Sequence, residues 1–128
     1  SNGMKVPFDA LTVRPEVAYE IVKTAEVQPI LEDDGKVRNY SIFPDDENRR
    51  FAVYYLELDP DSYWESEPHL RGTMEFITVF SGTVEIKAHG KQFQVSEGEK
   101  IRFKGDTEHS YRNSGEETAV LHMILYNP

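Results

Sequence analysis

The sequence contains no cysteine among its 128 residues. This absence excludes a disulfide framework, thiolate metal ligands and thiol catalysis. It agrees with a cytoplasmic location, which we expect, because disulfides are rare in reducing compartments. A phosphate-binding glycine loop and a serine nucleophile motif are also absent, so neither nucleotide chemistry nor serine hydrolysis is indicated.

Positive charge is also scarce. The 14 lysine and arginine residues are outnumbered by 23 aspartate and glutamate residues, which gives a formal net charge of −9. The sequence has no basic stripe, so this chain should not bind nucleic acid by itself. Anionic membrane surfaces repel an acidic chain, and no apolar run approaches the ~18 residues that a membrane span needs. We therefore expect no membrane partner.

Short β-strand patterns are what the sequence does contain. Hydrophobic residues make up 38% and aromatic residues 12%, as in one globular domain. Strand-like runs cover residues 37–43, 51–56, 74–80, 84–88, 93–95, 101–103 and 119–126. Turn signals separate them at intervals of roughly ten residues, which predicts an all-β sandwich or barrel. Residues 16–31 fit either a short helix or strands, and Pro29 argues against a long helix.

The run at residues 51–56 is apolar on both faces of a predicted strand, because Phe51, Val53 and Tyr55 alternate with other apolar residues. Such a strand is typically covered on both sides, by the domain core and by a second layer or subunit. A single barrel does not cover its outer face, so we expect a homodimer.

Glu75 is the strongest single indication of a functional site. Side chains alternate along a strand, so Glu75 shares a face with Ile77 and Val79 and would project into an apolar interior. A buried carboxylate requires a metal, a cation or a proton. The alternative places Glu75 on the solvent face and Met74 and Phe76 in the core; the alternation alone does not decide between them.

Two stretches about forty residues apart, 69–82 and 98–113, carry hydrogen-bonding and metal-ligand residue types at a characteristic spacing. They resemble the two signature motifs of the cupin family. The positions in register are His69, Glu75, Gly82, Gly98, His109 and Asn113. This resemblance implies an all-β fold of the cupin type, a double-stranded β-helix or jelly-roll barrel of two antiparallel sheets, and it favours the interior position of Glu75.

Three positions depart from the family pattern. Arg71 replaces the second motif histidine, while Lys104 and Asp106 replace a proline and a glycine. Family members typically bind metal through three histidines and one glutamate, so His69, Glu75 and His109 would remain as ligands. Such a set suits Zn, Fe, Ni or Mn. However, Arg71 places a cation nearby and can pair with Glu75 instead. We therefore expect no cofactor, with a divalent transition metal as the alternative.

The same residues define a predicted pocket for a small molecule. Its candidate ligand-binding residues are His69, Arg71, Glu75, His109, Tyr111 and Trp64. Without a metal, Arg71 presents a planar fork suited to anions, so we expect an anionic or zwitterionic effector. The alternative is that Glu75 pairs with Arg71 internally and the ligand is neutral. His122, on the last predicted strand, either lines the cavity or faces a partner.

Residues 5–11, Lys-Val-Pro-Phe-Asp-Ala-Leu, resemble the closing turn of the helix-turn-helix domain in XRE-family regulators, where a linker and then a cupin domain follow. We therefore divide the chain into residues 1–12, the end of such a domain or linker, and 13–128, the cupin domain. This resemblance implies a non-enzymatic sensor of a transcriptional regulator that reaches DNA only through a missing N-terminal domain. The alternative is a stand-alone metal-dependent cupin oxygenase or isomerase, favoured by the retained His69, Glu75 and His109.

Overall fold

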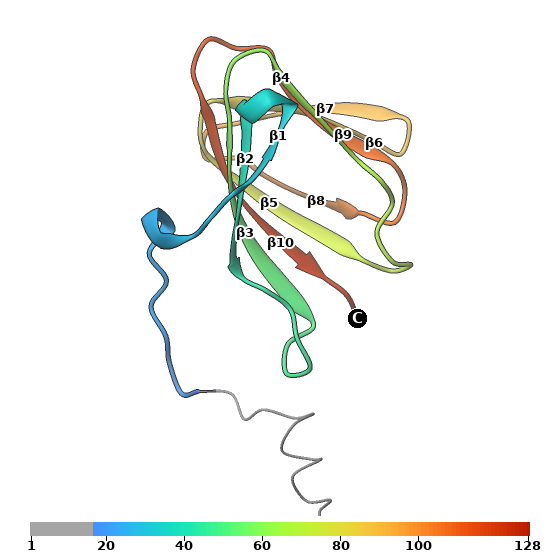
Figure 1. Cartoon of the computed structure of the whole chain (residues 1–128). Coiled ribbons are helices and arrows are strands. Elements are labelled where there is room, and N and C mark those ends of the chain that lie inside the picture. Colours follow the sequence, from blue (N-terminus) through green and yellow to red (C-terminus); the bar gives the residue numbers. More distant parts are fainter. Residues whose placement is uncertain (1–16) are drawn as a thin grey trace, which may run out of the picture.

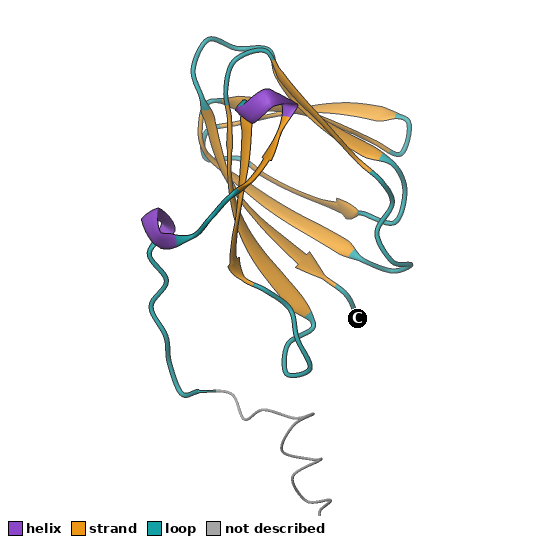
Figure 2. Ribbon diagram, in the orientation of Figure 1, coloured by secondary structure: helices purple, strands orange, loops and turns teal. Residues whose placement is uncertain are grey.

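The computed structural model describes residues 17–128, and strands dominate this part of the chain (Figure 1, Figure 2). The strands are β1 (Ile30–Glu32), β2 (Val37–Phe43), β3 (Phe51–Leu58), β4 (Ser62–Ser66), β5 (Met74–Ser81), β6 (Thr83–Ala88), β7 (Lys91–Ser96), β8 (Lys100–Lys104), β9 (His109–Asn113) and β10 (Ala119–Tyr126). Two single-turn 3-10 segments, η1 (Thr24–Glu26) and η2 (Asp33–Gly35), are the helical elements of residues 17–128. Within this range no helix has the length and apolar character needed to cross a membrane.

The strands form two antiparallel sheets that enclose one interior (Figure 1). The six-stranded sheet has the order β1-β2-β3-β10-β5-β8, and the four-stranded sheet has the order β4-β9-β6-β7. The chain repeatedly changes sheets, for example from β3 to β4, from β5 to β6 and from β9 to β10. The predicted all-β jelly-roll barrel of two antiparallel sheets is confirmed, and β2 and β10 have the predicted bounds.

The interior between the sheets is filled by every second side chain of the central strands. The most deeply buried apolar residues are Leu56, Leu58, Ile77, Ile86, Leu121, Val37, Val79 and Val84. Burying one such side chain contributes about 1.5–3 kcal/mol. This core surrounds Glu75, Tyr111 and Asn113, each with at most 1% of its surface exposed. The hydrophobic packing therefore holds three polar side chains away from water.

Gly82, the last glycine of the first motif, connects the two sheets between β5 and β6. Its φ angle of +77° is in the left-handed region, which favours glycine. An added Cβ would lie 2.9 Å from the Cα of Ala119 and 3.1 Å from the carbonyl oxygen of Thr118. The close approach of β10 therefore explains the motif glycine by sterics rather than by ligand binding.

The outer face is the side of the six-stranded sheet turned away from the interior, and it is rich in aromatic side chains. Its exposed members include Phe51, Phe76, Phe80 and Tyr126. His122 also lies on this face: it pairs with Tyr55 and Thr78 on the neighbouring strands, and its ring centroid is 5.8 Å from that of Phe80. Of the two positions expected for His122, the structure shows the one outside the cavity.

Some predictions concern the N-terminal region. The helix-turn-helix resemblance at residues 5–11 and the boundary between residues 12 and 13 lie outside the described residues. The ambiguous pattern at 16–31 becomes, within its described part, one 3-10 turn and the beginning of a short edge strand, β1. Residues Asp33–Gly35 form a tight turn in which Asp33 and Asp34 have positive φ angles.

Candidate metal and ligand site

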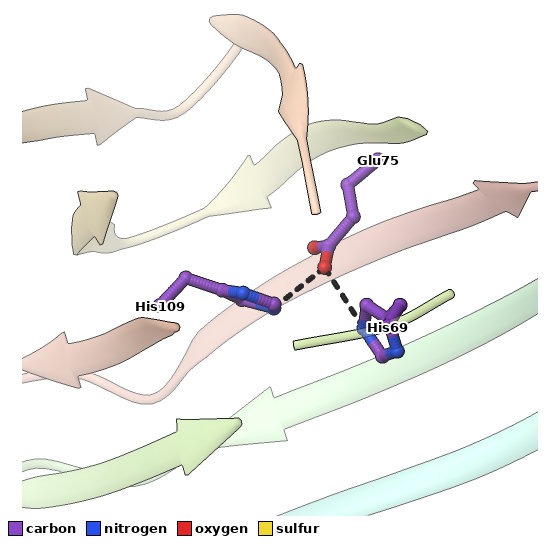
Figure 3. A group of neighbouring side chains, drawn as sticks. All are labelled: His69, Glu75 and His109. Carbon is purple, nitrogen blue, oxygen red and sulfur yellow. Dashed lines mark ion pairs between the residues drawn. The ribbon is translucent and has the colours of Figure 1, made fainter. Parts of the chain in front are cut away.

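Three separate segments bring their side chains to one point inside the barrel (Figure 3). Glu75 is the second residue of β5, His109 is the first residue of β9, and His69 lies in the connection between β4 and β5. Glu75 is fully buried, so it does share the interior face with Ile77 and Val79. A strand cannot bury a carboxylate among apolar neighbours unless polar partners meet it there, and the two imidazoles do so.

Backbone hydrogen bonds tie the two motif segments together. The His69 amide donates to the carbonyl oxygen of Gly105 at 2.9 Å, and the Gly105 amide donates to that of Thr73 at 2.8 Å. Asp106, which occupies a position where the family pattern has glycine, accepts a hydrogen bond from the Gly72 amide at 3.1 Å. The unusual residue thus stabilises the loop next to the site.

One oxygen of Glu75 lies between both histidines, as the dashed lines of Figure 3 show. The Glu75 Oε2 atom is 2.6 Å from the Nε2 of His109 and 3.2 Å from the Nε2 of His69. The other oxygen, Oε1, accepts a hydrogen bond from the Tyr111 hydroxyl. His109 has 3% of its surface exposed, whereas the His69 side chain is 31% exposed and links the cluster to the surface.

The cluster strongly favours the ionised form of Glu75. Burial alone would raise the pKa of this carboxyl, but its contacts with His109, His69 and Tyr111 outweigh burial and lower the pKa to about 2. Burial likewise works against a charged His109, yet Glu75 raises the pKa of that imidazole above its ordinary value. Burial, and then the Glu75 charge, raise the pKa of Tyr111, so its hydroxyl remains a donor.

The geometry of the close pair is suited to a shared cation. The His109 Nδ1 atom lies 2.7 Å from the carbonyl oxygen of Thr107, to which it can donate a hydrogen bond. In the neutral imidazole Nε2 is then an unprotonated acceptor, and it faces Glu75. Glu75 Oε2 and His109 Nε2 are fully buried and lack a partner in hydrogen-bond geometry, although they are 2.6 Å apart. Two acceptor atoms this close need a proton or metal between them. One ligand atom from each of His69, Glu75 and His109 lies within 4.8 Å of the others, so the set fits a divalent transition metal.

The aromatic candidates pack beside this cluster. Tyr111 is almost completely buried and contacts Glu75, so it belongs to the interior and not to a pocket mouth. The half-buried Trp64 stacks on Tyr111 with ring centroids 5.0 Å apart. Trp64 therefore supports the orientation of Tyr111 through this stacked contact.

Arg71 lies apart from the cluster. It is exposed, and within residues 17–128 it forms neither an ion pair nor a hydrogen bond. The sequence allowed Arg71 either to pair with Glu75 or to bind an anion. The Arg71–Glu75 pair is absent, because the partners of Glu75 are His69, His109 and Tyr111. The sequence misled here because His69 and Arg71, two residues apart, share a face only on a regular strand, whereas residues 67–73 are a loop.

Gly105 is a site residue that the sequence analysis did not single out. A Cβ added there would lie 3.0 Å from the Glu75 Oε2 and 3.1 Å from both the Glu75 Cγ and the His69 Cδ2. The available signal was its place within the second motif, between the atypical Lys104 and Asp106. Only a residue without a side chain lets the loop close over the carboxylate.

We expect Gly105→Ala to displace the Glu75 and His69 side chains and to destabilise the fold by about 1–3 kcal/mol, as overpacking does. Zn²⁺ affinity of the chain should fall about tenfold or more, as it does when groups supporting metal ligands are disturbed. Gly115→Ala is the matched control, because its new methyl group would meet only the Asn113 side chain, at 3.3 Å. Equal melting temperatures and equal Zn²⁺ affinities for the two variants would contradict this role of Gly105.

A jelly-roll barrel with an interior His–Glu–His group defines the class of this protein. The model of the Cupin domain family, Cupin_2, matches residues 54–125, more than half of the chain. The chain therefore belongs to the cupin family, as the two motifs indicated.

The similar proteins include transcriptional regulators. The chain is 28% identical over 128 residues to the HTH-type transcriptional regulator SutR of Escherichia coli K12, and the match covers all of this chain and 68% of the regulator. It is 32% identical to the crystal structure of the Cupin_2 domain of an XRE-family transcriptional regulator from Enterobacter cloacae. That match covers 73% of this chain and 98% of that one, with a TM-score of 0.69.

Proteins with enzyme names share the fold at lower identity. A predicted oxalate decarboxylase from Thermotoga maritima superposes with a TM-score of 0.72 and 15% identity, over 85% of this chain and 100% of that one. This likeness shows the fold alone.

Proposed function

We propose that this cupin domain senses a small molecule for a transcriptional regulator and that it is not an enzyme. The observation that carries the proposal is the relation to SutR, a helix-turn-helix regulator, over the whole length of this chain. The XRE-family cupin domain from Enterobacter cloacae supports it, as the identity there is 32%. The net charge of −9 argues that DNA is bound by another part of the regulator.

The sensing site in this proposal is the interior group His69, Glu75 and His109, supported by Tyr111 and Trp64. His69 is the member that an incoming molecule meets first, because its side chain is 31% exposed while Glu75 and His109 are buried. A ligand that contacts His69 changes the electrostatic environment of a carboxylate held in the core. We infer that this change biases the packing of the barrel and of the DNA-binding domains attached to it.

The regulator function can be tested on the protein encoded by the complete gene. A basic helix-turn-helix encoded upstream of residue 4 is expected, and the full-length protein should bind its own promoter region in a fluorescence anisotropy assay. A stabilising small molecule should change that affinity. A gene that begins at Met4, together with turnover of an organic substrate by the purified chain, would refute the proposal and favour the enzyme.

The enzyme alternative rests on one observation, the convergence of two imidazoles and a carboxylate. These residues would hold a divalent metal such as Zn, Fe, Ni or Mn, which would supply Lewis-acid or redox chemistry when bound. Tyr111 would then orient Glu75, and the carbonyl of Thr107 would fix the tautomer of His109. We propose weak metal binding, because Arg71 replaces the fourth ligand of the family pattern.

We expect Arg71→His to raise the affinity for Zn²⁺ or Ni²⁺ about tenfold or more. The substitution places an imidazole at the fourth ligand position of the family motif, on the loop that carries His69, where it reaches the metal once the exposed side chain turns inward. It also removes a positive charge that opposes a dication. Metal content after purification, measured by mass spectrometry, and titration with a competing chelator report the change. Arg71→Gln is the control for loss of charge alone. Stoichiometric metal that survives mild chelation in the unmodified protein would refute weak binding.

We also propose a cytoplasmic homodimer. The location is proposed from the regulator function and from the bacterial origin of the similar regulators, because bacterial DNA lies in the cytoplasm. The dimer would bury the outer face of the six-stranded sheet, which carries Phe51, Phe76, Phe80 and Tyr126 in exposed positions.

A further inference from the structure

A small cavity of about 150 Å³ lies beside His69. It is lined by charged, polar and apolar residues from four places in the fold: the loop after β2, the start of β3, the first motif and the end of β10. His69 contacts Glu75 at 3.2 Å and also lines this cavity. A molecule in the cavity therefore touches an imidazole that belongs to the buried cluster.

Two opposite charges, those of Asp45 and Arg50, share the lining of this cavity. In the described part of the chain, neither side chain forms an ion pair or accepts or donates a side-chain hydrogen bond. Tyr54 also lines the cavity. Burial raises the pKa of its hydroxyl, and the negative charge of Asp45 raises it further. Both charges are thus available to an incoming ligand.

Uncharged polar groups complete the cavity. Thr73 has only 4% of its surface exposed and lines the cavity, yet across residues 17–128 its hydroxyl has no hydrogen-bond partner. The Tyr54 hydroxyl is likewise without a partner in the described part of the chain. Both hydroxyls are therefore free to hydrogen-bond to polar groups of a ligand in the cavity.

The size and walls of the cavity restrict the ligand. A space of about 150 Å³ holds a molecule near the size of benzene. Ala52, Leu70 and Leu125 form its apolar part. A small molecule with a short side chain fits inside this space, whereas most of a nucleotide would lie outside it.

We propose that this cavity binds a zwitterionic small molecule, a short-chain α-amino acid, with its carboxylate on Arg50 and its ammonium group on Asp45. The inference rests on the proposed sensing function and specifies the ligand class. A guanidinium fork matches a carboxylate in two parallel hydrogen bonds. An aspartate accepts from an ammonium group, and the apolar wall receives the side chain.

In this proposal Arg50, and not Arg71, binds the carboxylate of the ligand. The sequence pointed to Arg71 because it occupies a ligand position of the family motif. In the structure Arg71 is exposed and is not part of the cavity lining, whereas Arg50, nineteen residues before His69 in the chain, is. The two arginines therefore form a matched pair for a test.

The experiment uses the whole chain, calorimetric titration and a thermal-shift screen. The screen contains the L-amino acids and a general panel of neutral, cationic and anionic metabolites. For the amino acid that binds most tightly, its methyl ester lacks the carboxylate and its N-acetyl derivative lacks the ammonium charge. Each derivative should bind about 10- to 100-fold more weakly, the value of one charge-assisted hydrogen bond.

The variants assign each charge to its partner. Arg50→Gln should weaken the amino acid about 10- to 100-fold and should bind the acid and its ester equally. Asp45→Asn should do the same for the free amine and the N-acetyl compound. Arg71→Gln should bind as the unmodified chain does. Both anchors are exposed, so the unliganded variants should keep the melting temperature of the parent.

The outcomes separate this inference from the sensing function. If other metabolites stabilise the chain and no amino acid does, the amino-acid inference is wrong and sensing stands. If Arg71→Gln abolishes binding while Arg50→Gln does not, the anchor is Arg71 and the inference is overturned. If no compound of any class binds the chain, the proposed sensing function fails as well.

Discussion

Replacing Glu75 with alanine should lower the free energy of unfolding by about 3–5 kcal/mol, the usual effect of removing one member of a buried charged pair. The change would leave His109 and Tyr111 without their common partner in a core from which water is excluded. It would also leave a cavity between the sheets. Urea denaturation with a chelator present, at one protein concentration, measures the loss.

Glu75→Gln provides the matched control, because glutamine keeps the volume of the side chain and an oxygen that accepts from Tyr111. Its amide can donate to a neutral His109, so the core remains satisfied. We expect this variant to lose metal binding completely and to lose much less stability than Glu75→Ala. Similar stability losses in the two variants would mean that packing, and not the hydrogen-bonded cluster, determines the effect.

The same carboxylate should make the chain sensitive to acid. The pKa of Glu75 falls from 4.5 to about 2 on folding, so its contribution is fully present above pH 4.5. The contribution is lost as the pH falls from about 4.5 through about 2, because the unfolded chain then binds the proton more readily. The shift corresponds to about 3 kcal/mol. Glu75→Gln should flatten the stability profile in this pH window, and an unchanged profile would contradict the assignment.

The position of Glu75 was predictable from strand alternation together with the cupin motifs, because alternation alone left both faces of the strand open. Ile77 and Val79 fix the inward parity of β5, and the motif spacing placed His69 and His109 within reach. Turn signals likewise separated the predicted strands at 84–88 and 93–95, and β6 and β7 are joined by a turn in which His89 and Gly90 both have positive φ angles. These inferences needed only local patterns and the two motifs.

The surroundings of His69 were not predictable in this way. Arg50 meets the first motif only after β3 has aligned with β10, and no local pattern reports that distance. Arg71 occupies a motif position but lies in a loop, so strand alternation does not determine the direction of its side chain. The importance of Gly105 follows from the contacts that an added methyl group would make, and these contacts depend on the three-dimensional structure.

Phe76→Glu should convert the proposed homodimer into a monomer. Phe76 lies on the outer face between its strand partners Ile124 and Arg102, and 40% of its surface is exposed in the single chain. A charge in the centre of an apolar interface must be desolvated, and the loss of hydration is unfavourable by several kcal/mol even with Arg102 opposite, because the charge of Arg102 must be desolvated as well. A loss of about 4 kcal/mol weakens association about a thousandfold.

Tyr63→Glu is the control with matched exposure. Tyr63 is also 40% exposed, but it lies on β4 in the opposite, four-stranded sheet, where its ring is 5.0 Å from the guanidinium carbon of Arg112. Light scattering and sedimentation at micromolar concentration should give a dimer for the unmodified chain and for Tyr63→Glu, and a monomer for Phe76→Glu. An unmodified chain that is monomeric under these conditions would refute the dimer, because the outer face would then be stable in water. Loss of the dimer in the Tyr63 variant instead would place the interface on the four-stranded sheet, where charged and polar side chains predominate.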